Sequence, residues 1–110
     1  MRARWIRLLG IGAAMLVTTV FPLSAQAAGS VETGKELYNT YCVICHGPNM
    51  VNSGARAFDL RKFPLGARAR FVKSVKDGKK GQNEMPAWGD ILTAEEISHL
   101  WAYTKTRGKM

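Results

Sequence analysis

Hydrophobic residues follow two different patterns along the chain. Positions 8–23 form an almost continuous apolar run, whereas beyond residue 28 the hydrophobic residues recur three and four positions apart. This second pattern covers about 30–41, 67–77 and 94–106, and such spacing places apolar residues on one face of an α-helix. No segment gives a convincing strand. We therefore expect an all-α protein of short helices, preceded by a segment of another kind.

Polar residues and glycines at the edges of these stretches mark helix ends. Ser30 or Thr33 can cap the first helix, and Thr33 also opens a Thr-Gly-Lys-Glu capping box. Thr93 and Glu96 have the same spacing before the last helix. Gly78 suits the C-terminal end of the middle helix. Each predicted helix therefore has a local start or stop residue.

The apolar run near the start has the layout of a secretory signal peptide. Three arginines precede it, no acidic residue interrupts it, and Ala25-Gln26-Ala27 supplies small residues for cleavage. A membrane anchor is the alternative, but 8–23 is shorter than the roughly 20 residues that span a bilayer. We expect residues 1–27 to be removed on export to the periplasm. Residues 28–110 then form one domain with no stable membrane insertion.

Removal of this segment changes the composition. The whole chain of 110 residues is 46% hydrophobic with a formal charge of +8. The segment 28–110 keeps 13 basic and 8 acidic residues, a formal charge of +5. The length of the whole chain excludes a large multidomain enzyme and a polytopic membrane protein. A domain this small usually needs a disulfide, a metal or a cofactor to complete its core.

Both cysteines of the chain lie in one motif, Cys42-Val43-Ile44-Cys45-His46. The C-x-x-C-H pattern predicts covalent attachment of one c-type haem. Two thiols three residues apart on a helical turn can each form a thioether with a haem vinyl group. His46 then lies under the iron and offers an imidazole nitrogen as the proximal ligand.

Other interpretations of the motif fit less well. A zinc site needs four ligands, and only Cys42, Cys45, His46 and the distant His99 are available. A redox-active disulfide is expected within a thioredoxin-like βαβ context, which the helical pattern does not provide. A structural disulfide across two residues constrains little, because the benefit of loop closure grows with loop length.

The order of motifs resembles that of class I cytochromes c over essentially all of 28–110. The signatures that carry the resemblance are Gly34-x-x-x-Tyr38-x-x-x-Cys42-x-x-Cys45-His46-Gly47 and Leu100-Trp101-Ala102-Tyr103. The resemblance implies a cytochrome c fold, with three to four short helices around one covalently bound haem. It also implies that the first and last helices cross at Gly34, where a residue without Cβ permits close approach. Tyr38 and Tyr103 would pair beside this crossing.

A second family feature concerns the iron's sixth ligand. Glu84-Met85-Pro86-Ala87-Trp88-Gly89 resembles the distal-ligand loop of the family, which implies that Met85 binds iron. Met50 follows His46 too closely to reach the opposite haem face, and Met110 ends the chain. His99 is a competing ligand, although its position relative to Ile97 and Trp101 predicts a place on the solvent face.

One part of the family pattern differs here. Many relatives have a Gly-Pro well downstream of the haem histidine, and its carbonyl accepts the Nδ1–H of that ring. In this chain Gly47-Pro48 follows His46 directly, at the start of a loop covering 47–66. Either Pro48 or a later loop carbonyl can fill the role.

A haem iron with both axial positions filled has no open site for substrate and changes by one electron. Methionine as a ligand raises the reduction potential over that of a bis-histidine site. Candidates for the apolar shell that keeps water away are Trp88, Phe63, Phe71 and Leu92. We therefore expect an electron carrier rather than an enzyme. The alternatives are a haem subunit of a larger dehydrogenase, and a haem sensor or peroxidase with a displaceable sixth ligand.

The basic residues suggest the kind of partner. Lysines and arginines gather before the Met85 loop, at Arg68, Arg70, Lys73, Lys76, Lys79 and Lys80. Such a cluster can steer docking onto an acidic redox protein, or simply form a solvated face. An exported protein is not expected to bind nucleic acid, and we expect a monomer.

Two short segments resemble small cytochromes c that serve pyrroloquinoline-quinone alcohol dehydrogenases. They are Gly47-Pro48-Asn49-Met50-Val51 and Asp59-Leu60-Arg61-Lys62-Phe63-Pro64. The resemblance implies that electrons come from a periplasmic quinoprotein dehydrogenase and pass to a terminal oxidase. A cytochrome bc1-type complex as the donor is equally consistent with the chemistry.

Overall fold

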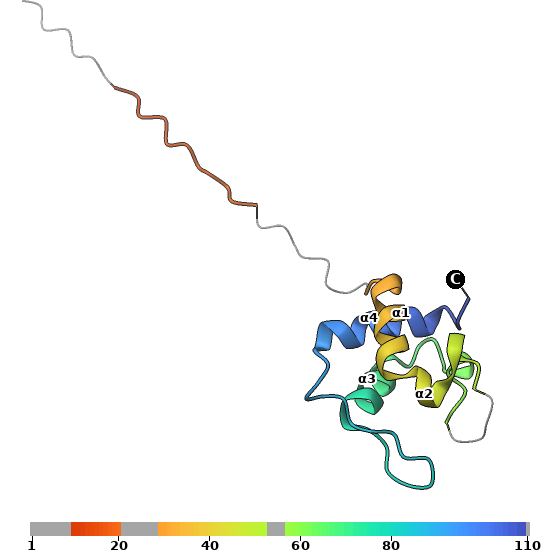
Figure 1. Cartoon of the computed structure of the whole chain (residues 1–110). Helices are drawn as coiled ribbons and strands as arrows, with labels where there is room; N and C mark the ends of the chain where they lie inside the picture. The colour runs from red at the N-terminus through yellow and green to blue at the C-terminus, as the bar shows by residue number, and fades with distance from the viewer. Residues whose placement is uncertain (1–9, 21–28, 53–56, 110) are drawn as a thin grey trace, which may run out of the picture.

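A computed structural model describes residues 10–20, 29–52 and 57–109 (Figure 1). Its α-helices are α1 (Val31–Tyr41), α2 (Val43–His46), α3 (Arg68–Asp77) and α4 (Ala94–Lys105). Two single-turn 3-10 helices, Pro48–Met50 and Leu60–Lys62, lie between α2 and α3. Within the described ranges there is no strand, only an isolated antiparallel bridge between Lys79 and Met85. The all-α prediction is confirmed.

The predicted signal peptide falls largely outside the described residues. Its cleavage site at 25–27 is among the positions that the structure does not describe, and residues 10–20 form no helix. Among the described residues, no helix has the length and apolar character needed to cross a lipid bilayer.

The helix caps agree with the sequence except at one position. Ser30 is the N-cap of α1, with its Oγ accepting a hydrogen bond from the Thr33 N–H at 3.2 Å. Thr33 therefore lies inside the helix and does not cap it. The capping box before α4 is confirmed, because Thr93 Oγ accepts from the Glu96 N–H and Glu96 Oε2 accepts from the Thr93 N–H.

The crossing of α1 over α4 organises the domain (Figure 1). A Cβ atom at Gly34 would collide with the backbone carbonyl of His99, so only glycine allows this approach. Beside the crossing, the rings of Tyr38 and Tyr103 pack with centroids 5.1 Å apart, and both side chains are buried. The predicted crossing and the predicted aromatic pair are both confirmed.

Aromatic side chains fill the space between α3, α4 and the 3-10 helix before α3. Phe71 and Trp101 have ring centroids 5.1 Å apart, and Phe63 makes edge-to-face contacts with both. Further buried hydrophobic residues of this core include Met50, Val75, Leu92, Ile97 and Leu100. The apolar stripes predicted for the three long helices therefore face one shared core.

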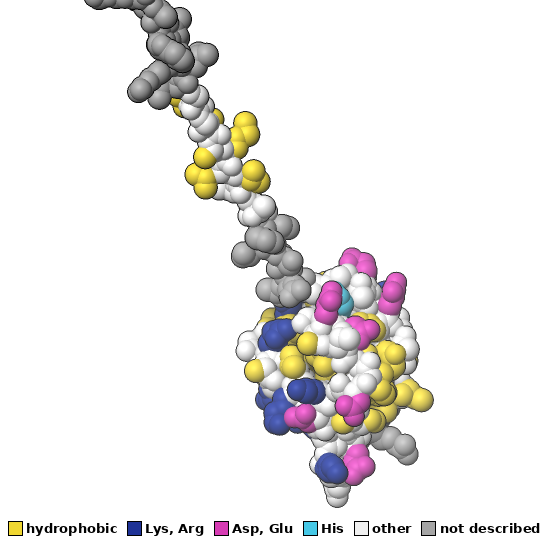
Figure 2. Space-filling model, turned by 90° about the vertical axis from the view of Figure 1, so that its left-hand side faces the viewer, with side chains coloured by type: hydrophobic (Ala, Val, Ile, Leu, Met, Phe, Trp, Pro, Cys, Tyr) yellow, Lys and Arg dark blue, Asp and Glu magenta, His cyan; other side chains and the backbone are white. Residues whose placement is uncertain are grey.

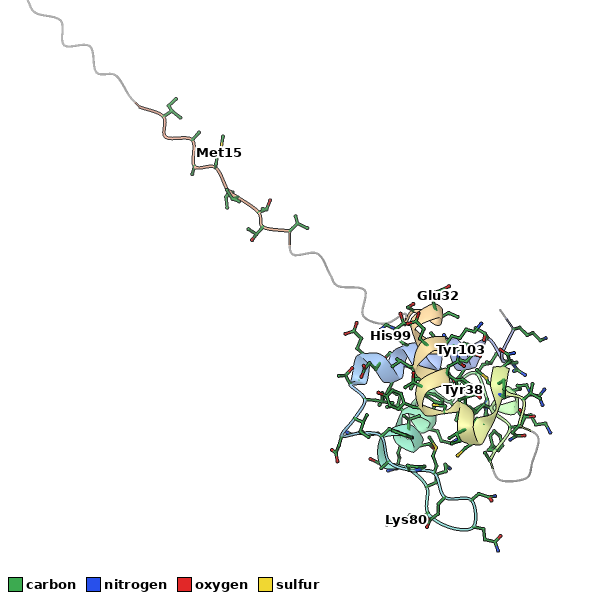
Figure 3. All side chains as sticks on the ribbon, in the orientation of Figure 1. Met15, Glu32, Tyr38, Lys80, His99 and Tyr103 are labelled. Atoms are coloured by element: carbon green, nitrogen blue, oxygen red, sulfur yellow. The ribbon has the colours of Figure 1, made fainter. Side chains whose placement is uncertain are left out.

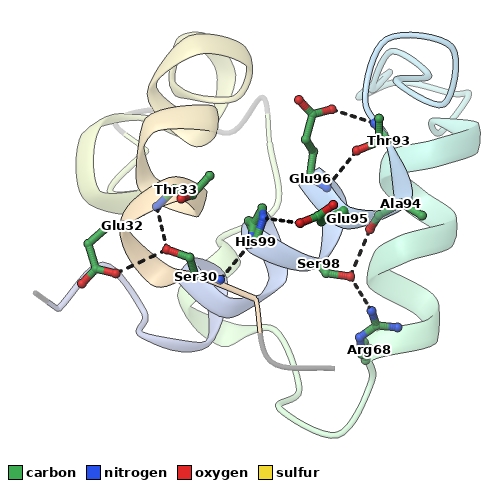
Figure 4. A network of polar contacts seen from close by, with 10 residues as sticks. All are labelled: Ser30, Glu32, Thr33, Arg68, Thr93, Ala94, Glu95, Glu96, Ser98 and His99. Carbon is green, nitrogen blue, oxygen red and sulfur yellow. Dashed lines mark hydrogen bonds and ion pairs between the residues drawn. The ribbon is translucent and has the colours of Figure 1, made fainter. Parts of the chain in front are cut away.

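His99 lies in a different environment from the one predicted. Its side chain is 19% exposed rather than directed into solvent. Its Nδ1 accepts a hydrogen bond from the Ser30 N–H at 2.8 Å, and its Nε2 lies 3.7 Å from a carboxylate oxygen of Glu95 (Figure 4). The prediction was wrong because the periodicity of α4 gives no information about the segment before α1, which covers this face.

Candidate haem site

The two cysteines and the histidine of the motif share one helical turn. Cys42 precedes α2, and its carbonyl accepts from the N–H groups of Cys45 at 3.3 Å and His46 at 2.9 Å. Cys42 is half-buried against the core and Cys45 is exposed; no disulfide joins them. Burial raises the pKa of the Cys42 thiol to about 12, so the unmodified thiol is neutral at physiological pH. The turn thus presents two thiols and an imidazole together.

The ring of His46 is held by a backbone carbonyl. Its Nδ1 lies 3.2 Å from the Phe58 carbonyl oxygen, so an Nδ1–H donates to that oxygen and Nε2 stays available for a metal. Burial lowers the pKa of His46 below its ordinary value, which favours the neutral, ligating form. Of the two possibilities left open by the sequence, a later loop carbonyl fills the role and Pro48 does not.

Tyr38 has a polar role that the sequence did not reveal. Its hydroxyl donates a hydrogen bond to the Gly47 carbonyl at 2.5 Å, which fixes the residue that follows His46. Burial raises the pKa of Tyr38 above its ordinary value, so the phenol remains a donor. The pattern of aromatic residues predicted only its packing, because a tyrosine at a core position gives no hint of where its hydroxyl points.

Met85 lies on the loop that joins α3 to α4, half-buried against the core. Its N–H and carbonyl pair with the carbonyl and N–H of Lys79, both at 2.9 Å. The chain between these two residues projects from the domain, with Lys80 near its tip (Figure 3). Met85 therefore sits at the base of a short hairpin, fixed by its backbone.

The second half of this loop is attached to the end of α3. The Trp88 N–H donates to the Val75 carbonyl at 2.9 Å, and the Gly89 N–H donates to the Lys76 carbonyl at 3.0 Å. These carbonyls belong to the last turn of α3, where no helical partner is available. The Trp88 ring also packs edge-on against Tyr41, with centroids 5.3 Å apart. Because Tyr41 directly precedes Cys42, this contact joins the Met85 loop to the cysteine motif.

The described residues do not form the alternative zinc site. No three His, Cys, Asp or Glu side chains among them gather as metal ligands. His99, which a zinc site would require, instead has its Nδ1 occupied by the Ser30 N–H. The donor set suits haem c better, with paired thiols, one free imidazole nitrogen and a thioether on a separate loop.

Comparison with known proteins identifies the family. Residues 29–103 match the profile described as cytochrome C oxidase, cbb3-type, subunit III. The chain belongs to this family of cytochrome c domains. Cytochrome c6 of Nostoc sp. is 34% identical over 100 residues, which cover 87% of this chain and 84% of that protein. As a member of the family, the protein binds haem c covalently with its iron, and its relatives such as cytochrome c6 are electron-transfer proteins.

Other relatives are much longer proteins. The quinohemoprotein alcohol dehydrogenase ADH IIB of Pseudomonas putida is 34% identical over 86 residues, which cover 78% of this chain but 12% of that protein. The chain likewise spans 30% of the cbb3-type oxidase subunit CcoP of Azospirillum brasilense. The crystal structure of the c-type cytochrome XoxG from Methylobacterium extorquens AM1 is similar, with a TM-score of 0.56 and 25% identity. That match covers 71% of this chain and 50% of XoxG.

Proposed function

We propose that residues 28–110 form a periplasmic one-electron carrier. In this proposal Cys42 and Cys45 attach the haem, and His46 and Met85 bind its iron on opposite faces. The observation that carries it is the fixed turn of α2, where His46 is held through Nδ1 by the Phe58 carbonyl and keeps Nε2 free. The bound haem supplies the one-electron chemistry, and the chain's own residues orient and insulate it.

Met85 is supported as the sixth ligand by the way its loop is held. Backbone hydrogen bonds to Lys79 fix Met85 at the hairpin base, and the Tyr41–Trp88 contact ties the loop to the haem-attachment turn. A thioether ligand favours ferrous iron and raises the potential relative to two histidines. Buried Phe63, with its aromatic neighbours, keeps water from the core behind the site.

The basic residues before Met85 divide into two sets. Arg68 donates a hydrogen bond to Ser98 Oγ at 2.8 Å, and the Arg70 guanidinium lies 4.5 Å from the Phe63 ring centroid. These arginines are therefore engaged within the molecule. Among the lysines, Lys76, Lys79 and Lys80 are exposed, and Lys73 is exposed but forms an ion pair of 2.8 Å with Asp77. In Figure 2, acidic side chains gather around the histidine at the upper end of the face, and Lys and Arg side chains lie mainly on its left and lower parts, with acidic side chains beside some of them.

The exposed lysines before Met85 support docking onto an acidic redox protein. Long-range attraction raises association rates and is screened by salt, with a Debye length of about 10 Å at 0.1 M. The second-order rate of electron transfer with the partner is therefore expected to fall steeply as ionic strength rises. A rate that is constant from low to high salt would contradict docking by charge.

We propose a periplasmic dehydrogenase as the electron donor, with a quinoprotein alcohol dehydrogenase as the leading candidate, and a terminal oxidase as the acceptor. Support comes from the Pseudomonas putida alcohol dehydrogenases, in which a similar haem region lies within the same polypeptide. Stopped-flow mixing of the ferric protein with a substrate-reduced quinoprotein dehydrogenase tests the donor. Rapid, saturable reduction of the haem by the dehydrogenase is expected. If only a cytochrome bc1-type complex reduces the haem, that complex is the donor and the dehydrogenase is not.

A second candidate is a haem subunit bound within a larger dehydrogenase. It is favoured by the small share of the alcohol dehydrogenases that this chain matches, 12% and 11% of their lengths. Size-exclusion chromatography of a native periplasmic extract separates the two. A free carrier elutes at the mass of residues 28–110 with haem, and its N-terminus is Ala28. Co-elution with dehydrogenase activity through the whole purification would favour the subunit.

A further inference from the structure

The carbonyl that accepts from His46 belongs to a segment held on both sides. We propose that Asn52 and Asp59 are positioning residues, which keep the Phe58 carbonyl against His46 Nδ1 and thereby set the electron donation of the His46 ligand. The inference rests on the proposed function, since it assumes that His46 binds the haem iron. Neither residue touches the ring itself, and each acts through the backbone next to Phe58.

The first contact lies on the N-terminal side of Phe58. Asn52 is half-buried, and its Nδ2–H donates to the Ala57 carbonyl at 2.6 Å. This hydrogen bond joins the chain that leaves α2 to the residue immediately before Phe58. Because the peptide unit is planar, fixing the Ala57 carbonyl also fixes the N–H and the α-carbon of Phe58.

The second contact lies on the C-terminal side. Asp59 is the N-cap of the 3-10 helix Leu60–Lys62, and its Oδ1 accepts from the Arg61 N–H at 3.0 Å. The Arg61 guanidinium also binds both carboxylate oxygens, at 2.9 Å and 2.8 Å. Such a two-pronged pair fixes direction as well as distance. The Phe58 ring packs edge-to-face on Phe63, with centroids 6.2 Å apart, which anchors the same residue from its side chain.

The hydrogen bond to Phe58 changes what His46 supplies to the iron. A carbonyl that accepts from Nδ1–H increases the basicity of the ring and favours ferric over ferrous iron. Weakening that bond is therefore expected to move the reduction potential to more positive values. It also exposes the Nδ1–H to exchange with water. A more positive reduction potential and faster exchange of the Nδ1–H occur together only if Asn52 and Asp59 act through His46.

The test uses the haem-loaded protein with paired substitutions of one kind. Asn52→Leu removes the amide donor without a change of charge, and Asn39→Leu makes the same change at an exposed position of α1. Asp59→Asn is matched by Asp77→Asn, because each removes one negative charge from an ion pair of 2.8 Å. Solvent exchange of the His46 Nδ1–H is followed by NMR in the ferrous state, and the potential by spectroelectrochemical titration.

We expect Asn52→Leu to speed exchange of the Nδ1–H about tenfold and to raise the potential, whereas Asn39→Leu changes neither. Asp59→Asn is expected to raise the potential more than Asp77→Asn and to speed exchange as well. The proposal is overturned if each variant has the same rate of Nδ1–H exchange and the same reduction potential as its matched control. If Asn52→Leu does not load haem, Asn52→Ser removes the same amide donor with a smaller side chain and carries the same expectations.

Failure of the proposed function would look different. Met85 ligation is read separately, from the near-infrared methionine–iron charge-transfer band of the ferric wild-type protein. A wild-type protein without that band would contradict the ligand set, while faster Nδ1–H exchange in Asn52→Leu alone would still support positioning. A wild-type protein with the band and unaltered exchange in both variants would overturn only the positioning role.

Discussion

The α1–α4 crossing and the Met85 loop are held in opposite ways. At the crossing, buried side chains and a glycine without Cβ bring two helix backbones together, with Tyr38 and Tyr103 packed beside them. The loop instead has exposed residues at its tip and is fixed mainly by backbone hydrogen bonds to Lys79, Val75 and Lys76. The difference predicts that the crossing determines stability, whereas the loop determines how easily Met85, the proposed sixth ligand, leaves the iron.

The largest expected effect is at the crossing. Gly34→Ala places a methyl group against the His99 carbonyl, and the two helices must separate to accommodate it. We expect a loss of about 3 kcal/mol in the free energy of unfolding, since overpacking a close contact outweighs the better helix propensity of alanine. Denaturant unfolding of the haem-loaded protein measures it.

The control for this substitution is Gly66→Ala, because a Cβ there meets no atom within 4 Å. We expect it to change the free energy of unfolding by less than about 0.5 kcal/mol. Equal losses in the two variants would show that close approach at Gly34 does not determine stability.

The next effect is on the loop. Trp88→Ala removes the ring that packs on Tyr41 and leaves the backbone hydrogen bonds in place. If this shifts the balance between closed and open loop by about 1.4 kcal/mol, exogenous imidazole binds the ferric protein about tenfold more tightly. Titration of the ferric spectrum with imidazole measures this. Tighter binding in Gly34→Ala than in Trp88→Ala would remove the distinction between the two regions.

A smaller effect separates the two tyrosines of the aromatic pair. Tyr38→Phe breaks the hydrogen bond to the Gly47 carbonyl, with an expected loss of about 1.5 kcal/mol in the free energy of unfolding. Tyr103 has a buried hydroxyl that finds no partner among the described residues, so Tyr103→Phe is expected to leave stability unchanged or slightly higher. The same denaturant series measures both, and a larger loss for Tyr103→Phe would reverse this assignment.

The smallest expected effect is on how the free energy of unfolding changes with pH in acid. Hydrogen bonds from Arg61 lower the pKa of Asp59 from 3.8 to about 2. A carboxyl whose pKa is lower in the folded state contributes stability above pH 3.8, and this is lost as the pH falls towards 2. Asp59→Asn is expected to make stability depend slightly less on pH over that interval, because Arg61 is partly exposed and solvent screens the pair. An unchanged slope in acid titration would show that the pair contributes nothing.

The sequence predicted the parts that side-chain patterns encode. Helix faces, the capping box at Thr93 and the crossing at Gly34 follow from periodicity and from the family signatures, and the structure has all three. The partner of His46 was not predictable, because the Phe58 carbonyl is a backbone group that any residue supplies. His99 was misplaced because the residue that covers it, Ser30, lies 69 positions away in the chain.

The electron carrier proposed here depends above all on ligation of the iron by Met85, which the near-infrared spectrum tests. The ferric wild-type protein is expected to show the near-infrared methionine–iron charge-transfer band, and Met85→Ala is expected to abolish it. Met50→Leu, a nearly volume-conserving change at the buried methionine after α2, is expected to retain the band. A spectrum that is the same in Met85→Ala and the wild type would contradict the Met-ligated electron carrier.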